Sequence, residues 1–134
     1  MNILERGKEY IYTYTVRFYT DATSVRFGMF IKTETGVMLG GSSTSTRNDA
    51  IPFLKSGTLV SVRFLFTCSL FPGTYFVNAA CSGDVAGRFG FLHRVLDAAL
   101  FRVRHEEPTP QSGIVDFGIQ PSVEILPETI TNLG

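Results

Sequence analysis

The sequence contains no tryptophan, only two cysteines and two histidines, and no long uninterrupted hydrophobic run. So few histidines and cysteines leave little material for a metal centre, which needs several such ligands or carboxylates converging on one point. The apolar stretches are far shorter than the ~20 residues that a membrane-spanning helix requires. Glu5 and Arg6 stand where the apolar core of a secretory signal would continue, so we expect no such signal.

An excess of charge of either sign is also missing, because 12 Lys and Arg stand against 12 Asp and Glu. Neutralising the phosphates of a nucleic acid needs a surplus of Lys and Arg, so the balance argues against a nucleic-acid partner. Charged residues make up only 18% and hydrophobic residues 44%, which excludes a disordered chain. The 134 residues fit one domain of the usual ~100–150 residues, and we therefore treat residues 1–134 as a single domain.

Phenylalanine is abundant, with 12 residues, and apolar residues recur at every second position. This period is typical of half-buried β-strands. Arg88–Leu100 is the one stretch where we expect a short helical turn. Cys68 and Cys81 fall on the inward phase of their strands, which favours buried reduced thiols over a disulfide. The predicted strands are Tyr10–Phe18, Val25–Thr33, a strand that begins at Val37–Leu39, Leu59–Thr67, Thr74–Cys81 and Ala98–Arg104.

Closely spaced strands with Gly and Pro turns predict an all-β fold, an antiparallel β-sandwich of immunoglobulin-like or jelly-roll-like type. The prolines of Glu106–Pro110 predict a hinge at the start of residues 106–134. Beyond the hinge, Gly113–Phe117 and Ser122–Leu126 are each expected to form a short terminal strand. A strand on a hinge can pair with its own sheet or with a partner's, so the sequence leaves open an ordinary edge strand and exchange into a homodimer.

Motifs for catalysis are missing as well. Gly40–Thr44 has the glycines of a phosphate-binding loop, but it lacks the Lys and does not open a helix. His93 and His105 have no evident orienting acid and no nucleophilic serine in a strained turn. The carboxylates of Glu106 and Glu107 point apart in an extended chain, which does not suit a general acid and base pair. We therefore expect no enzyme activity, no metal site and no cofactor.

The outward-facing residues of three strands form the main candidate binding surface. If Val25–Thr33, Thr74–Cys81 and Ala98–Arg104 share a sheet, its solvent face carries a set of aromatic, cationic and amide side chains. These carbohydrate-binding candidates are Arg26, Phe30, Lys32, Phe76, Asn78 and Arg102. A ring can stack on the flat face of a sugar while its neighbours bond the hydroxyls, and Arg can hold an anionic substituent.

Two alternatives to this surface remain. Phe30 and Phe76 can instead lie under loops or in a subunit interface, where exposed apolar patches are often found. The opposite face of the predicted sandwich offers a rival surface, which would carry Thr13, Thr15, Arg17, Ser61 and Arg63.

Several segments, taken in order, resemble one protein family. They are Gly7–Glu9 before an aromatic strand, Phe27–Lys32 followed by Thr35–Gly40, Phe64-x-Phe66 with Leu70–Tyr75, Asp97–Val103 and Gly113–Val115. Over roughly Gly7–Val123 their order and spacing look like the C-terminal domain of Wzt. Wzt is the ATP-binding subunit of the ABC transporter that exports O-antigen polysaccharide. The resemblance is nearest to the members that serve polymannose O-antigens.

The resemblance implies a non-catalytic, carbohydrate-binding sandwich, often dimeric, that sits behind an ATPase domain in the cytoplasm at the inner face of the inner membrane. It implies binding of the capped, end-modified non-reducing end of the O-antigen, which links chain termination to export in lipopolysaccharide biosynthesis. The implied partners are this polysaccharide, a second copy, and the membrane transporter subunit through the ATPase domain. That ATPase half is absent from the sequence, which has no phosphate-binding loop.

Two other functions stay open at this point. One is a sandwich domain of a different carbohydrate-active or surface protein. The other is a structural or self-association domain, in which the exposed aromatic residues would serve an interface between copies.

Overall fold

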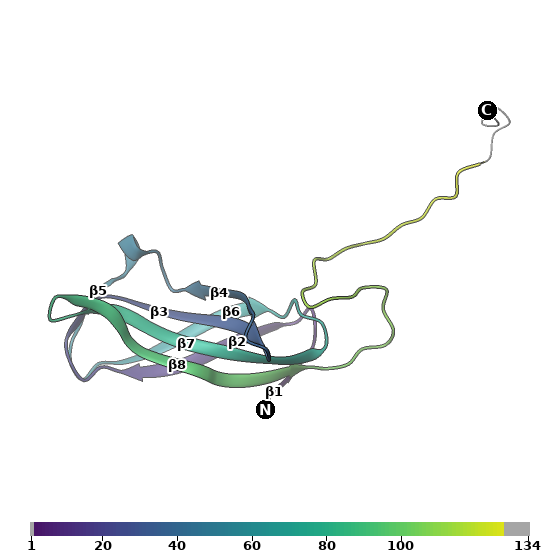
Figure 1. Ribbon diagram of the computed structural model, residues 1–134. Helices are drawn as coiled ribbons and strands as arrows, with labels where there is room; N and C mark the ends of the chain where they lie inside the picture. The colour runs from purple at the N-terminus through teal and green to yellow at the C-terminus, as the bar shows by residue number, and fades with distance from the viewer. Residues whose placement is uncertain (1, 128–134) are drawn as a thin grey trace.

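The computed structural model consists of β-strands and one short 3-10 turn (Figure 1). The description covers residues 2–127, without the side chains of residue 91 and residues 93–98. Among these residues, no helix is long and apolar enough to cross a membrane. The elements are β1 (Asn2–Leu4), β2 (Glu9–Arg17), β3 (Ala22–Thr33), β4 (Met38–Ser43), η1 (Arg47–Asp49), β5 (Ile51–Leu54), β6 (Leu59–Thr67), β7 (Gly73–Val85) and β8 (Arg88–Val103).

Two sheets of unequal size make up the sandwich. The larger sheet has the order β1-β8-β7-β3-β4, with β5 also paired to β3, and the smaller sheet consists of β2 and β6. All pairs are antiparallel except β1 with β8. The predicted all-β, antiparallel β-sandwich is therefore confirmed. So is the prediction that β3, β7 and β8 share one sheet.

The alternation of apolar and polar residues decides which side of each strand is buried. In β2 and β6 the even-numbered residues are half-buried or buried and the odd-numbered residues are exposed. On the larger sheet Phe27 is 1% exposed and Val77 is 3% exposed, and both lie in clusters with residues of the smaller sheet. Full burial of a side chain of this size contributes about 1.5–3 kcal/mol relative to exposure. The inner faces of the two sheets thus form the core, as predicted.

Tyr14 on β2 connects the two sheets by a hydrogen bond. Its hydroxyl donates to the backbone carbonyl of Gly28 on β3 at 2.8 Å and lies 3.2 Å from that of Ala80 on β7. Burial raises the pKa of Tyr14 to about 12, so the hydroxyl keeps its proton at neutral pH. The predicted buried thiols are also confirmed, because Cys68 and Cys81 are free and buried.

Some expectations about the strands were wrong. The expected helical turn in Arg88–Leu100 is part of β8, because a tight turn at Ala86 and Gly87 returns the chain against β7. Both turn residues have positive φ, as hairpin turns of this length require. The structure also contains β1 and β5, which the sequence did not suggest because they are only three and four residues long.

The predicted terminal strands are also largely absent from the described residues. Gly113–Phe117 contributes a single bridge, from Val115 to Leu70, and Ser122–Leu126 is not a strand. The remainder of the predicted hinge and tail, residues 128–134, lies outside the described residues.

Arg6 helps to attach the chain beyond β8 to the sandwich, together with the bridge from Val115 to Leu70. The Arg6 guanidinium bonds both carboxylate oxygens of Glu106 at 2.8 Å and the Asp116 carboxylate at 2.6 Å. It also lies 4.9 Å from the centre of the Phe71 ring. We call these four residues the Arg6 clasp. The clasp fixes the place where the C-terminal segment leaves the sandwich.

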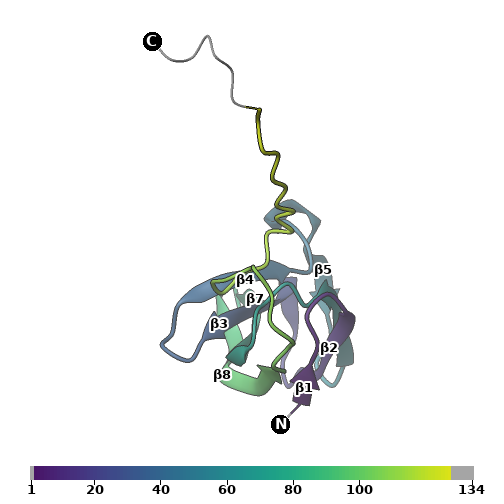
Figure 2. The same cartoon turned by 90° about the vertical axis from the view of Figure 1, so that its right-hand side faces the viewer.

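After the clasp, the chain stands away from the sandwich in both views (Figures 1 and 2). We call residues 118–127 the tail. Apolar residues occupy its odd positions, and Ile119, Val123 and Ile125 are 65%, 91% and 90% exposed. This period of two is the pattern of a strand with one apolar face. The tail thus has an alternation like that of a strand, although residues 118–127 pair with no strand of the described chain.

Candidate functional site

Four of the six predicted site residues lie side by side on the outer face of the larger sheet. The register places Phe30 of β3 opposite Asn78 of β7, and Lys32 opposite Phe76. Phe30 and Phe76 are therefore diagonal neighbours, about 7–8 Å apart, which is within reach of aromatic side chains. The residues between them on each strand point the other way, into the core.

The two predicted arginines lie on the same face but further along it. Arg102 of β8 pairs with Thr74, and Arg26 of β3 pairs with Ser82. Thr74 and Ser82 are eight residues apart on β7, a distance of about 26 Å at ~3.3 Å per residue. The structure thus spreads the two guanidinium groups along the face, on either side of the Phe30–Phe76 pair.

The exposure of these side chains agrees with an outward-facing surface except at one residue. Phe30, Lys32, Phe76 and Arg26 are half-buried, and Arg102 is exposed. The expectation that Asn78 faces solvent was wrong, because it is 3% exposed. Buried amides are held by hydrogen bonds within the protein, and Asn78 already has an interaction partner. Asn78 therefore supports the surface rather than offering free groups to a ligand.

The guanidinium N–H groups of Arg26 and Arg102 on this face are available to a ligand. Among the described residues, the guanidinium groups of Arg26 and Arg102 form no ion pair or side-chain hydrogen bond. Each guanidinium presents five donors in a planar fork that suits carboxylate, phosphate and hydroxyl groups. Arginines without partners beside aromatic rings can bind a ligand that has both apolar faces and polar or anionic groups.

The sequence did not reveal a second aromatic pair on the same face. Phe53, Thr23, Asp84 and Phe89 are successive register partners across β5, β3, β7 and β8. Both rings are 54% exposed, and the Arg47 guanidinium lies 5.0 Å from the centre of the Phe89 ring. The signal was hidden because Phe53 lies on an unpredicted strand and Phe89 in the stretch expected to be helical. The adjacent Ala-Gly turn could have revealed the hairpin.

The rival surface on the smaller sheet has no aromatic ring. Thr13 pairs with Arg63 and Thr15 with Ser61, and all four are exposed, as is Arg17. The other outward residues of β2 and β6 are aliphatic, acidic or hydroxyl-bearing, without an aromatic side chain. This face can form hydrogen bonds, but it cannot stack on a sugar ring.

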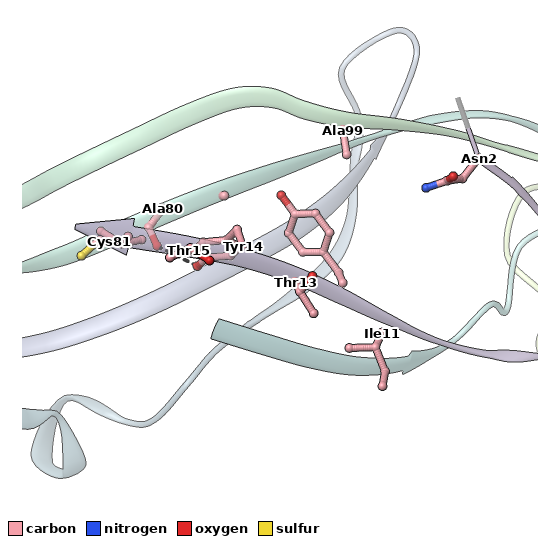
Figure 3. A pocket seen from close by; sticks show the side chains of 11 residues that line it. Asn2, Ile11, Thr13, Tyr14, Thr15, Ala80, Cys81 and Ala99 are labelled. Atoms are coloured by element: carbon pink, nitrogen blue, oxygen red, sulfur yellow. Dashed lines mark hydrogen bonds between the residues drawn. The ribbon is translucent and has the colours of Figure 1, made fainter. Parts of the chain in front are cut away.

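Grooves run along both sides of the smaller sheet, because β2 and β6 are narrower than the sheet they cover. On the β2 side a hollow of about 440 Å³ has Asn2 and Ala99 of the larger sheet on one wall and Ile11 and Thr13 on the other (Figure 3). We call it the β2 groove. On the other side a hollow of about 490 Å³, the β6 groove, lies between residues 40–44 and residues 63–67. Both grooves run beside strand edges.

The described residues bring together no group of three or more His, Cys, Asp or Glu that could hold a metal ion. The His93 side chain, considered above for catalysis, lies outside the described side chains. The outer face itself offers aromatic rings for stacking and guanidinium groups for hydrogen bonds and contacts with anions.

Comparison with known proteins agrees with this architecture. Residues 1–117 match the family model described as the Wzt C-terminal domain. A solved structure described as "Crystal structure of the C-terminal domain of wzt" is similar, with a TM-score of 0.76 and 19% sequence identity, over 90% of this chain and 73% of that chain. No curated protein gives a significant match. Because the family model covers most of the sequence, the chain belongs to the Wzt C-terminal domain family.

Proposed function

We propose that this chain binds the O-antigen polysaccharide handled by an ABC exporter in lipopolysaccharide biosynthesis, and that it catalyses no reaction. The observation that carries the proposal is the outer face of the larger sheet, where Phe30 and Phe76 lie beside Lys32. Arg26 and Arg102, which lie on the same face, form no ion pair or side-chain hydrogen bond with the described residues. Membership of the Wzt C-terminal domain family supports a carbohydrate as the ligand.

The binding mode follows from the shape of this face. A sugar ring lies against Phe76 and Phe30, because aromatic rings and the C–H side of a pyranose bury apolar area together. Arg102 is exposed at the end of the face and holds a hydroxyl or an anionic group with its fork of donors. A flat, open face buries little area, so we expect weak binding to a single sugar.

The proposal also specifies which end of the polysaccharide binds. We take it to be the end-modified, non-reducing terminus of a polymannose-type chain, with a methyl or phosphate cap. The parent transporter subunit would hold the domain at the cytoplasmic side of the inner membrane through its ATPase half. Arg102 supports an anionic cap because it is the most exposed cation of the predicted set.

Association into a homodimer is a second part of the proposal. Alternating apolar residues of the tail are 65% to 91% exposed in one chain. Both grooves run beside strand edges that can accept another strand. Exchange of the tail between two copies would bury these residues and give the dimer two sugar sites, which strengthens binding through avidity. Light scattering should show a dimer for the full chain and a monomer after removal of residues 118–134.

The experiment that tests sugar binding compares capped with uncapped oligomannosides and other bacterial O-polysaccharides on an array. We expect selective binding of capped chains. Phe76→Ala and Arg102→Ala should weaken it about tenfold while thermal unfolding midpoints stay within a few degrees. Arg63→Ala and Leu59→Ala, on the outer face of β6, serve as controls.

Each alternative result has a clear meaning. Loss of binding in Arg63→Ala rather than Arg102→Ala would move the site to the rival face. A large drop in the unfolding midpoint of Phe76→Ala would show that this ring belongs to the core. Absence of binding to every polysaccharide would favour a self-association domain.

A further inference from the structure

The exposed aromatic pair at the far end of the outer face, Phe53 and Phe89, lies outside the hydrophobic core. Phe53 and Phe89 each keep about half of their surface in water, at 54% exposed, and neither is among the residues of the two core clusters. Directly paired residues lie on the same side of a sheet, so both rings share the face of Thr23 and Asp84. At about 4.8 Å between strands, the two rings start about 14 Å apart with Asp84 between them.

Arg47 adds a positioned donor group to this end of the face. It belongs to η1, on the connection between β4 and β5, and its guanidinium reaches the Phe89 ring on β8 at 5.0 Å. Apart from this contact, Arg47 forms no ion pair or side-chain hydrogen bond with the described residues, and neither does Asp84. Ring stacking thus holds the planar donor group in place while leaving its N–H groups available to a ligand.

The second cluster repeats the chemistry of the first and is continuous with it. Phe76 and Asp84 are eight residues apart on β7, about 26 Å, and Arg26 lies between them opposite Ser82. Two guanidinium groups lie along this route, Arg26 on the way and Arg47 at its end, and neither forms an ion pair or side-chain hydrogen bond with the described residues. A polymer held at Phe30 and Phe76 that continues along the strands passes Arg26 and arrives at Phe89.

We infer that Phe53, Phe89 and Arg47 form a second sugar subsite, so that the domain binds a run of several sugar residues rather than a terminal residue alone. The inference rests on the proposed function and adds the length of glycan that the face recognises. Phe89 positions Arg47 and packs against a sugar with the 54% of its surface that stays exposed. The donors of Arg47 bind hydroxyl or anionic groups, while Asp84 accepts hydrogen bonds from hydroxyls. Two weak subsites on one chain reinforce each other, because binding at the first raises the effective concentration at the second.

The test measures how affinity depends on glycan length, by calorimetry on the full chain with an α-linked mannose disaccharide and octasaccharide that carry the same terminal group. We expect the octasaccharide to bind at least about tenfold more tightly, which corresponds to about 1.4 kcal/mol. Phe89→Ala and Arg47→Ala should remove most of this difference and leave disaccharide binding unchanged. Leu59→Ala and Arg63→Ala, exposed on the opposite sheet, should retain the difference.

Several results would overturn the inference. One is a difference in affinity between the disaccharide and the octasaccharide that persists in both Phe89→Ala and Arg47→Ala. A longer glycan also binds more tightly for statistical reasons alone, and that gain would persist in both variants. Another is equal weakening of both oligosaccharides, which would indicate a general loss of structure. Phe89→Leu keeps an apolar side chain but removes the ring, and it should behave like Phe89→Ala if the ring itself contacts the sugar.

The failure of the inference can be told apart from the failure of the proposed function. If the wild-type chain binds both lengths equally, only the second subsite is wrong. If it binds neither oligosaccharide, both the second subsite and the polymannose ligand are wrong. The polysaccharide array then decides whether the chain binds sugars at all.

Discussion

The hydroxyl of Tyr14 offers a clean measure of what holds the two sheets together. It donates to the Gly28 carbonyl at 2.8 Å, across the sandwich from its own strand. Substitution of Tyr14 by Phe keeps the ring, which packs against Tyr12 and Phe64 at centroid distances of 5.6 and 6.3 Å. The Tyr14→Phe variant therefore loses the hydrogen bond and almost nothing else.

Because the substitution removes little more than one hydrogen bond, the loss of stability can be estimated from the value of such a bond. A hydrogen bond within a protein contributes about 1 kcal/mol net, in a range of ~0.5–1.5 kcal/mol. For a chain of 134 residues a loss of about 1 kcal/mol lowers the thermal midpoint by roughly 3–5 °C. We expect this shift for Tyr14→Phe by calorimetry at pH 7. Tyr19→Phe, at a residue that is 85% exposed, is the control and should leave the midpoint unchanged.

The difference in stability between the wild type and Tyr14→Phe should change at alkaline pH. Burial raises the pKa of Tyr14 to about 12, so its favourable contribution is complete below the unfolded-chain pKa near 10 and is lost as the pH rises towards 12. The stability of the wild type should therefore fall relative to Tyr14→Phe across this range. An identical midpoint for wild type and variant at pH 7 would refute the reasoning, because it would show that the inter-sheet bond has no net value.

Two further predictions concern β4 and the C-terminal segment. Gly41→Ala would place a Cβ 2.4 Å from a backbone oxygen of β3, so β4 should separate from β3 and exchange its amide hydrogens faster. Gly40→Ala is the control, because a Cβ there has nothing within 4 Å, and it should leave the exchange unchanged. In the clasp, the Arg6 guanidinium lowers the pKa of Glu106, and the Gly118 N–H together with Arg6 lowers that of Asp116. This stability is present above the ordinary values of 4.5 and 3.8 and is lost as the pH falls, so Arg6→Ala should flatten the acid side of a melting-temperature profile.

The core could be predicted because one simple rule governs which side chains enter it. Where one face of a strand is buried, apolar residues must recur with period two, and a slip of one residue would expose them all. The inward positions of β2, β3, β6 and β7 follow this rule without exception in their predicted ranges, and so the outer face of the larger sheet could be identified.

The rest depended on local irregularities that carry no periodic signal. A register shift between Thr23 and Arg26, where Ser24 has a positive φ of 52°, changes the phase at the start of β3. Such a bulge hides which residues beyond it face outward, and so the sequence did not place Thr23 in the row that also contains Phe53 and Phe89. The burial of Asn78 could not be predicted because it depends on neighbours in space and not on its own strand.

The proposed sugar site and the proposed association between copies use different surfaces of the domain. The grooves that suit an added strand lie beside β2 and β6, whereas the aromatic and arginine side chains lie on the outer face of the larger sheet. A tail from a second copy that enters a groove would therefore leave the sugar face uncovered. The Arg6 clasp fixes the exit of the tail close to the Arg102 end of that face, because Glu106 follows β8 by only three residues. Each copy in such a dimer would keep the whole proposed sugar face open, from Arg102 to Phe89, so one polysaccharide would meet two extended binding surfaces rather than two points.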